Sequence, residues 1–340
     1  MKIIVTGGAG FIGSAFVRLA LAEGARVVNL DKLTYAGNLE NLEAVAQLPA
    51  YRFVHGDICD AALVNDLVAA EKPDALVHFA AESHVDRSIL EPSPAFETNL
   101  RGTFTLLEAA RAHRLPRFIH VSTDEVYGSI PSPGEADENY PLTPSSPYSA
   151  SKAGSDLLAR SYFTTYGTPV IVTRASNNYG PYQFPEKLIP LMISNAFEDR
   201  ALPVYGDGMQ VRDWLYVDDH CRAIHALLAK GRAGEIYNIG GSAALANIDV
   251  VRRILAATGK PDSLIRSVVD RPGHDRRYAL SSAKLMRETG WAPAVSFEEG
   301  LARTVAWYRE NSGWVERVKS GDYRAYYARN YDDRRSSGQE

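Results

Sequence analysis

The sequence predicts an α/β fold in which a doubly wound parallel sheet is accompanied by a smaller α/β domain. Through the first half of the chain, short apolar segments rich in β-branched residues alternate with segments of helical spacing. A glycine-rich turn separates the first such pair, and after about residue 176 the chain changes to loops rich in Asn, Pro and Tyr. Near-continuous apolar strands that alternate with helices are typical of a parallel sheet that is covered on both faces.

The first strand is expected at Lys2–Thr6 and the first helix at Phe11–Ala22, with the turn Gly7–Gly13 between them. Five further strands are expected, at Arg26–Leu30, Arg52–His55, Ala75–Ala80, Arg117–Val121 and Pro169–Thr173. Ligands of such sheets bind beyond the carboxyl ends of the strands. Motifs that follow the strands should therefore meet at one edge of the sheet.

Residues 1–176 are expected to form the sheet domain, to which part of 212–240 returns. Residues 177–340 are expected to form mainly the smaller domain, which would lie as a lid over the edge of the sheet. Helices are expected there at Leu188–Phe197, His220–Ala229 and Val250–Thr258, between loops at Asn177–Pro185, Pro203–Gly208 and Asp270–His274. The polar residues 332–340 are expected to fray, as chain ends commonly do.

The composition is that of an ordinary globular protein, with 340 residues, 45% hydrophobic residues and a net charge of −4. This charge gives no reason to expect nucleic acid as a partner. The two cysteines, Cys59 and Cys221, are too few for a disulfide framework or a zinc site, so we expect no metal and a reducing, cytoplasmic compartment. Charged residues interrupt the first apolar stretch and no apolar run reaches ~20 residues, so neither a signal peptide nor a membrane span is expected.

The turn Gly7–Gly13 has the spacing of a dinucleotide-binding loop. Side chains at Gly7, Gly10 or Gly13 would keep backbone N–H groups away from a pyrophosphate, and the following helix points its positive end at that charge. Asp31 ends the next strand, where a carboxylate can accept hydrogen bonds from free ribose hydroxyls but repels a 2′-phosphate. The sequence therefore predicts a Rossmann-type domain that binds NAD rather than NADP.

Two further segments after strands fit the same cofactor. Asp57 and Ile58 follow the third strand and fit an adenine contact, although a turn aspartate explains Asp57 equally well. Ala80 and Ala81 follow the fourth strand, where small residues allow the backbone to approach a ligand.

Tyr148 and Lys152 are spaced to share one face of a helix. A tyrosine is a poor base at neutral pH, and lowering its pKa by ~3 units requires about 4 kcal/mol of phenolate stabilisation. We expect Lys152 and a positive nicotinamide ring to supply it. An isolated Tyr-x-x-x-Lys has no function in most proteins, but here it follows a glycine loop and a strand that leads into Ser122 and Thr123.

Asp124 and Glu125 come directly after Thr123. Neighbouring residues of a regular strand point to opposite faces, so a bend after Thr123 is expected if both carboxyl groups are to reach one ligand. Burial and mutual repulsion would raise the pKa of one of them, as a division into acid and base requires. Without the tyrosine, a solvated acidic turn would be the better interpretation.

These motifs together resemble the extended short-chain dehydrogenase family, and within it the 4,6-dehydratases of nucleotide sugars. The resemblance runs from Met1 to about Tyr331. Its most specific segments are Asp31–Asn38, Ala81–Ser88, Ser122–Gly128, Asn177–Tyr182 and Asp270–Asp275.

The resemblance implies dehydration of dTDP-glucose to its 4-keto-6-deoxy derivative, with NAD regenerated in each cycle. Tyr148 would take the proton of the 4-hydroxyl while Thr123 holds that hydroxyl and hydride leaves C4. Glu125 would remove the C5 proton, and protonated Asp124 would donate to the departing 6-hydroxyl. Hydride then returns to C6. The implied catalytic residues are thus Thr123, Asp124, Glu125, Tyr148 and Lys152.

The resemblance also implies two sets of binding residues. The cofactor set is Gly7, Gly10, Phe11, Ile12, Gly13, Asp31, Lys32, Leu33, Thr34, Asp57, Ile58, Ala80, Ala81, Ser83, Thr98, Tyr148, Lys152 and Asn178. The set for the nucleotide sugar is Ser83, Thr123, Asn177, Lys187, Leu188, Pro203, Tyr205, Arg212, Asn247, Arg271 and His274.

By family analogy we expect a homodimer that pairs the helices around Phe96–Ala112 and Ser151–Tyr166. Three other functions stay open at this point. An NAD-dependent nucleotide-sugar epimerase needs no paired acids, and the substrate carboxylate of a UDP-sugar decarboxylase would fit badly beside Asp124 and Glu125. A cofactor-sensing module without turnover usually lacks the Tyr or the Lys, and both are present here.

Overall fold

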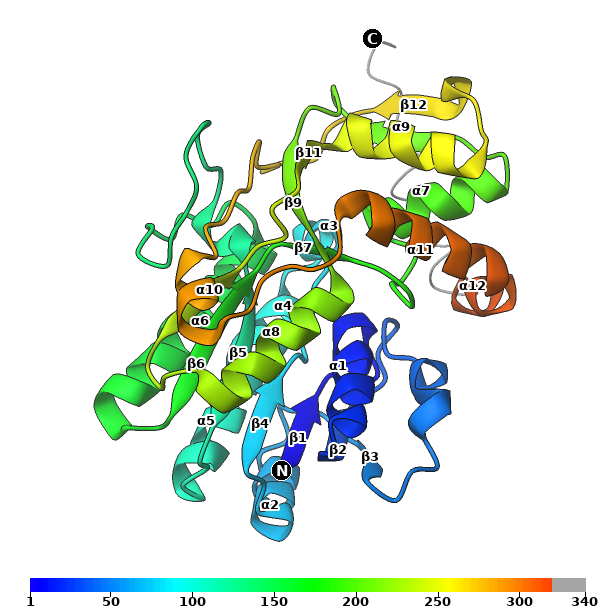
Figure 1. Ribbon diagram of the computed structural model, residues 1–340. Coiled ribbons are helices and arrows are strands. Elements are labelled where there is room, and N and C mark those ends of the chain that lie inside the picture. The colour runs from blue at the N-terminus through cyan, green and yellow to red at the C-terminus, as the bar shows by residue number, and fades with distance from the viewer. Residues whose placement is uncertain (320–340) are drawn as a thin grey trace.

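The computed structural model describes residues 1–319 and contains a seven-stranded parallel sheet in the order β10-β6-β5-β4-β1-β2-β3 (Figure 1). All neighbouring strands of this sheet pair in parallel. The strands are β1 (Lys2–Thr6), β2 (Arg26–Asp31), β3 (Tyr51–His55), β4 (Ala75–His78), β5 (Phe118–Thr123), β6 (Val170–Ala175) and β10 (Ile236–Ile239). The doubly wound parallel sheet expected from the sequence is confirmed.

Helices cover both faces of this sheet. One apolar core, which includes Val5, Phe16 and Ile224, packs the sheet against α1 (Phe11–Ala22), α8 (Val217–Lys230) and α10 (Ala283–Thr289). A second core, which includes Leu76 and Phe118, packs the other face against α2 (Ala61–Glu71), α5 (Thr103–Ala112) and α6 (Pro147–Tyr166). The chain between β4 and α5 forms α3 (Val85–Leu90), α4 (Ser93–Phe96) and a π-helical segment, Glu97–Gly102.

The later part of the chain builds a smaller unit above the carboxyl ends of the strands (Figure 1). Its third core, which includes Ile193, Val250 and Leu301, lies among helices and two small sheets. The small sheets are formed by β7 (Asn177–Tyr179), β9 (Val211–Tyr216) and β11 (Ala244–Ala246), and by β8 (Leu202–Tyr205) and β12 (Ile265–Val268). The helices are α7 (Leu188–Phe197), α9 (Asn247–Thr258), α11 (Phe297–Glu310) and α12 (Ser312–Val318).

Several element ends differ from the prediction. β5 continues through Thr123 because Ser122 and Thr123 pair with the end of β6, whereas β4 ends at His78 rather than Ala80. α8 begins at Val217, three residues earlier than expected, because Asp218 and Asp219 favour the positive end of a helix. α1 and α7 have the predicted bounds.

The described residues contain no helix that is both long enough and apolar enough to cross a membrane. The predicted fraying of 332–340 lies outside these residues, as does the end of the resemblance at about Tyr331.

Candidate active site

A cavity at the carboxyl ends of the strands brings together residues from both parts of the chain. All five predicted catalytic residues line it: Thr123, Asp124, Glu125, Tyr148 and Lys152. So do 16 predicted cofactor residues, namely Gly7, Gly10, Phe11, Ile12, Gly13, Asp31, Lys32, Thr34, Ile58, Ala80, Ala81, Ser83, Thr98, Tyr148, Lys152 and Asn178. Of the residues predicted for the nucleotide sugar, Ser83, Thr123, Asn177 and Lys187 line it.

The glycine turn forms one wall of the cavity, and its glycines have different roles. A Cβ on Gly7, whose φ is +71°, would lie 2.6 Å from the backbone nitrogen of Ala80, and a Cβ on Gly13 would lie 2.1 Å from the carbonyl oxygen of Gly7. A Cβ on Gly10 would approach only that same oxygen, at 3.3 Å. Gly10 is the N-cap of α1 and no side chain caps this end, so the first N–H groups of the helix remain available to a pyrophosphate.

Asp31 lies at the end of β2, where two backbone groups hold its carboxylate. The N–H of Ala9 donates to Oδ2 at 2.9 Å and the N–H of Leu33 donates to Oδ1 at 2.8 Å. Burial raises the pKa of this carboxyl group. Each carboxylate oxygen can accept a second hydrogen bond, so Asp31 can also bind ribose hydroxyls.

Leu33 and Asp57 do not line the cavity, contrary to expectation. The Asp57 carboxylate accepts from the N–H of Cys59 at 2.9 Å and forms an ion pair with Lys32 at 3.3 Å. These contacts order Asp57 beside Ile58, which does line the cavity, and the adenine contact of Asp57 stays a prediction. Leu33 contributes its N–H to Asp31 from a left-handed backbone conformation, with φ of 54°.

Tyr148 lies in the first turn of α6, which begins after a capping box formed by Ser146 and Ser149. Lys152 lies one turn later and donates from Nζ to the carbonyl oxygen of Val121 at 2.8 Å. Burial lowers the pKa of Lys152 to about 8. Among the protein groups, burial and then the Glu125 carboxylate raise the pKa of Tyr148, and the Thr123 hydroxyl offsets this only in part. The expected lowering of this pKa, which includes the nicotinamide ring, stays a prediction.

Buried polar side chains of β5 and β6 contact α6. Arg174 Nε lies 2.8 Å from Asp156 Oδ2, and His120 Nε2 lies 3.4 Å from Asp156 Oδ1. Asp156 is one turn beyond Lys152, so these contacts fix the rotation of the helix that carries Tyr148.

The bend expected after Thr123 is confirmed, since β5 changes there into a 3₁₀ turn, Asp124–Tyr127. The Thr123 hydroxyl donates to Asp124 Oδ1 and accepts from the N–H of Glu125, both at 3.2 Å. Asp124 is only 1% exposed, and its Oδ2 has no hydrogen-bond partner among the described residues.

The two carboxyl groups have raised pKa values from overlapping causes. Burial, followed by repulsion from Glu125, raises the pKa of Asp124 well above its usual range. Burial also raises the pKa of Glu125, against the opposing effect of Arg271, Arg212 and Lys187. Asp124 therefore keeps its proton more readily than Glu125, as the predicted division into acid and base requires.

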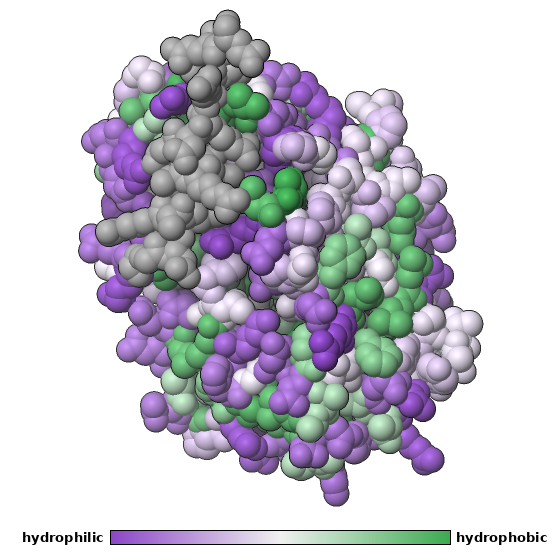
Figure 2. Space-filling model, turned by 180° about the vertical axis from the view of Figure 1, so that it is seen from behind, coloured by the Kyte–Doolittle hydropathy of each residue, from purple (hydrophilic) through white to green (hydrophobic). Residues whose placement is uncertain are grey.

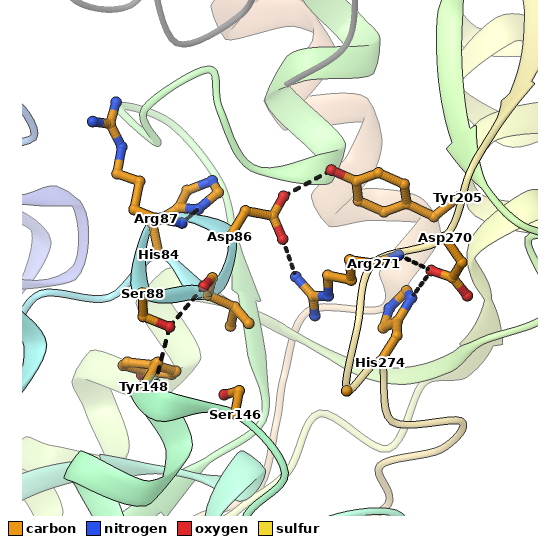
Figure 3. Close-up of polar contacts among 12 residues, drawn as sticks. His84, Asp86, Arg87, Ser88, Ser146, Tyr148, Tyr205, Asp270, Arg271 and His274 are labelled. Carbon is orange, nitrogen blue, oxygen red and sulfur yellow. Dashed lines mark hydrogen bonds and ion pairs between the residues drawn. The ribbon is translucent and has the colours of Figure 1, made fainter. Parts of the chain in front are cut away.

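The other residues predicted for the nucleotide sugar lie outside the cavity lining, and three of them, Tyr205, Arg271 and His274, form polar contacts with Asp86 and Asp270. Figure 3 shows the Arg271 and Tyr205 side chains meeting Asp86 of α3, at 3.0 Å from Arg271 Nη1 and 2.7 Å from the Tyr205 hydroxyl. His274 contacts Asp270 at 2.6 Å. The residues of the predicted set that do not line the cavity are Leu188, Pro203, Tyr205, Arg212, Asn247, Arg271 and His274.

Sequence reasoning missed several polar residues that line the cavity. Glu186 is buried and accepts from the Tyr35 hydroxyl at 3.0 Å and from Arg87 Nε at 3.2 Å. His220 is fully buried on α8. Glu186 directly precedes Lys187, which was predicted to bind the nucleotide sugar, and this position was a signal for Glu186. Nothing in the local sequence marks His220 as a residue of the site. The missed lining residues are Leu30, Ala36, Gly37, Gly56, Phe79, Glu82, Val121, Ser122, Ala175, Ser176, Gln183, Phe184, Glu186 and His220.

Within residues 1–319, no group of three or more His, Cys, Asp or Glu side chains is arranged to hold a metal ion.

Comparison with known proteins identifies the relatives of this site. The model of the GDP-mannose 4,6-dehydratase family matches residues 4–304. A dTDP-glucose 4,6-dehydratase from Shigella flexneri is 54% identical, over 98% of this chain and 100% of its own length.

Solved structures give the same result. A dTDP-glucose 4,6-dehydratase from Streptomyces venezuelae, with NAD and TYD bound, is similar with a TM-score of 0.92 and 56% identity, over 94% of this chain and 100% of that one. A UDP-glucose 4-epimerase from Thermus thermophilus in complex with NAD is similar with a TM-score of 0.86 and 33% identity, over 92% of this chain and 100% of that one. The chain belongs to the dTDP-glucose 4,6-dehydratase family.

Proposed function

We propose that this chain converts dTDP-glucose to dTDP-4-keto-6-deoxyglucose by eliminating water across C5 and C6. One observation carries the proposal: the buried carboxyl of Asp124, with a raised pKa and an unpaired Oδ2, shares a cavity with Glu125 and Tyr148. An acid that keeps its proton beside a second carboxyl group is what an elimination of water requires.

The cavity fits NAD as the cofactor. Gly10 leaves space beside the uncapped start of α1, which suits the pyrophosphate, and Asp31 suits the adenosine ribose. Asn178, Tyr148 and Lys152 would hold the nicotinamide end. When bound, NAD supplies a hydride acceptor for C4 and a hydride donor for C6, and its positive ring favours the Tyr148 phenolate.

Each protein group then has one task. The Tyr148 oxygen takes the proton of the sugar 4-hydroxyl, which the Thr123 hydroxyl positions. The 4-ketone makes the C5 proton acidic. The Glu125 carboxylate removes this proton and returns it to C5 when C6 is reduced. The C6–O bond breaks as the Asp124 carboxyl gives its proton to the departing hydroxyl, so that water leaves without a free hydroxide.

We propose that the two parts of the chain bind different molecules. Residues 1–176 bind NAD, and residues 177–340 mainly bind the nucleotide sugar. The return of β10 to the large sheet beside β6, and the packing of α8 near α1, support the proposal that part of 212–240 belongs with the first part.

Incubation with dTDP-glucose tests the proposal. The purified chain should give a product lighter by one water that forms a 4-keto chromophore in alkali. An epimerase would give an isomer of unchanged mass. A binding module or a decarboxylase would leave dTDP-glucose unaltered, and a second incubation with a UDP-sugar acid would reveal a decarboxylase by release of carbon dioxide. An isomer or unaltered dTDP-glucose in place of the dehydrated ketone would contradict the proposal.

We also propose a homodimer formed by α5 and α6, in the reducing cytoplasm that the free thiols Cys59 and Cys221 suit. Phe104 of α5 is 47% exposed and Leu157 of α6 is 55% exposed. Figure 2 shows apolar side chains gathered on this flank of the molecule. Burying such a patch in a second copy would remove it from water.

Light scattering should give twice the mass of the chain at micromolar concentration, and Leu157→Glu should return it to the single mass. The exposed residue Leu48, which lies away from these helices, provides the matched control Leu48→Glu. A wild-type protein that is monomeric at these concentrations would contradict the dimer.

A further inference from the structure

His220 lies in the first turns of α8 and lines the active-site cavity, although the proposed reaction assigns it no role. Its side chain is fully buried. One ring nitrogen, Nδ1, lies 2.9 Å from Asn178 Oδ1. The other, Nε2, has no hydrogen-bond partner among the described residues.

The contact with Asn178 fixes where the imidazole proton lies. Asn178 Nδ2 donates to the carbonyl oxygen of Ser176 at 2.9 Å, which orients the amide so that its oxygen faces the ring. An amide oxygen can only accept, so Nδ1 of His220 must carry a proton. Burial lowers the pKa of His220 to about 3, which keeps the ring neutral. Nε2 is therefore a lone-pair acceptor.

A buried acceptor without a partner is costly, and such groups in folded proteins usually have one. Because His220 lines the cavity, a ligand bound there can supply the missing donor. The pyrophosphate of NAD offers only acceptors at neutral pH, whereas the nicotinamide nucleoside carries two kinds of donor, the carboxamide NH₂ and the ribose hydroxyls. Asn178, predicted at the nicotinamide end, is the direct neighbour of His220.

We infer that His220 binds the nicotinamide nucleoside of NAD, with Nε2 accepting a hydrogen bond from the carboxamide or a ribose hydroxyl while Nδ1–H holds Asn178. This rests on the proposed function only through the use of NAD. His220 thus connects the cofactor to Asn178 without entering the proton transfers of the reaction.

Two substitutions test the roles of the two ring nitrogens separately. His220→Asn can keep a donor near the position of Nδ1 but does not reach the position of Nε2, and His220→Gln can place an acceptor near Nε2. We expect NAD affinity, measured by calorimetry on the full chain freed of cofactor, to fall about ten-fold in His220→Asn, the worth of one buried hydrogen bond, and by less in His220→Gln. His225→Asn, on the same helix but outside the cavity lining, is the matched control and should bind NAD as the wild type does.

A cofactor analogue identifies the donor. Nicotinic acid adenine dinucleotide lacks the carboxamide NH₂, so His220→Asn should not weaken its binding if the carboxamide is the donor. If a ribose hydroxyl is the donor, His220→Asn should weaken both dinucleotides equally. Unchanged NAD affinity in His220→Asn, or a larger loss in His220→Gln than in His220→Asn, would overturn the direct contact.

Nuclear magnetic resonance of ¹⁵N-labelled histidine provides a second test, which reads the wild-type ring directly and uses a variant only to assign its signals. In the NAD complex, the signals of His220, identified as those missing from His220→Gln, should show a proton on Nδ1 and none on Nε2. A doubly protonated ring would overturn the inference. Because these measurements report cofactor binding, they can succeed even if the chain fails to dehydrate dTDP-glucose.

Discussion

Asp86 of α3 and Arg271 of the loop after β12 form an ion pair of 3.0 Å between residues 185 positions apart in the sequence. The Tyr205 hydroxyl donates to the second carboxylate oxygen of Asp86 (Figure 3). Burial raises the pKa of Asp86, but Arg271, His84 and the Tyr205 hydroxyl together outweigh burial and hold this pKa well below its usual value of 3.8. The pair therefore joins the sheet domain to the part of the chain that carries the predicted substrate residues.

Asp86→Asn should destabilise the protein at neutral pH by about 3 kcal/mol, because it leaves a buried guanidinium without its counter-charge. The pair contributes stability above the unfolded pKa of Asp86, and this contribution is lost as the pH falls below 3.8. The penalty should thus shrink in acid, as followed by denaturant unfolding across pH. The control Asp207→Asn removes an exposed partner of Arg276 and should destabilise the protein much less. Equal losses of stability in Asp86→Asn and Asp207→Asn would contradict the stabilising role of the buried pair.

Asp124→Asn should make the protein more stable at neutral pH. The pKa of Asp124 is higher in the folded state than its ordinary value of 3.8, so the folded state binds the proton more tightly. Stability from this group is fully present below pH 3.8 and is lost as the pH rises through the folded pKa. Asparagine does not titrate, so the melting temperature should rise relative to the wild type at pH 7, by roughly 2 °C per kcal/mol. A difference that does not depend on pH would contradict this.

The double variant Asp124→Asn, Glu125→Gln should oxidise C4 but fail to eliminate water. Tyr148, Lys152 and Thr123 remain in place, whereas both groups that move protons at C5 and C6 are neutral amides. We expect NADH absorbance to build up on addition of dTDP-glucose, with loss of dehydration by about 10²-fold or more, as is usual for general acid-base groups. Full formation of the dehydrated ketone would contradict the assigned roles.

Arg271→Ala should raise KM for dTDP-glucose far more than it lowers kcat. A cation that binds the diphosphate stabilises the ground state and the transition state equally, which raises KM when the cation is removed. Because Arg271 also opposes the rise in the pKa of Glu125, a smaller fall in kcat is expected beside this effect. We expect roughly a ten-fold rise in KM, because a charge-assisted hydrogen bond contributes about 1.5–3 kcal/mol. Arg276→Ala, at an exposed site a few residues later, is the matched control. A fall in kcat with unchanged KM would instead place Arg271 in the chemistry.

The sequence predicted the first part of the fold better than the second. The strands of the large sheet are continuous apolar runs, and the bounds of β1 and α1 agree with the prediction. The strands of the second part are three to six residues long and pair across long stretches of chain, as β12 pairs with β8, so local patterns did not reveal them. The end of a strand also depends on the neighbouring strand with which it pairs. β5 extends to Thr123 because its last residues pair with β6.

The catalytic residues could be proposed from motifs that follow strands or share a helix face, and the raised pKa of Asp124 agrees with the prediction, whereas the pKa of Tyr148 does not follow from spacing. Lowering the pKa of Tyr148 requires charge that the surrounding protein groups do not provide, since burial dominates there. His220 could not be found from its local sequence, because its place in the cavity depends on the packing of α8 near the glycine turn. The hydrogen bond of Cys221 to the carbonyl of Ile12 is one contact of that packing.

The α6 helix has an unusual distribution of polarity. Tyr148, Lys152 and Asp156 form a buried polar stripe, while Leu157 and Phe163 are exposed. Amphipathic reasoning would therefore place the wrong face against the sheet. Because directional bonds, rather than apolar contact alone, determine how this helix is rotated about its axis, its outer surface is not needed to hold the phenol in place. New oligomeric partners could be acquired on that surface without moving the phenol from its place at the cavity.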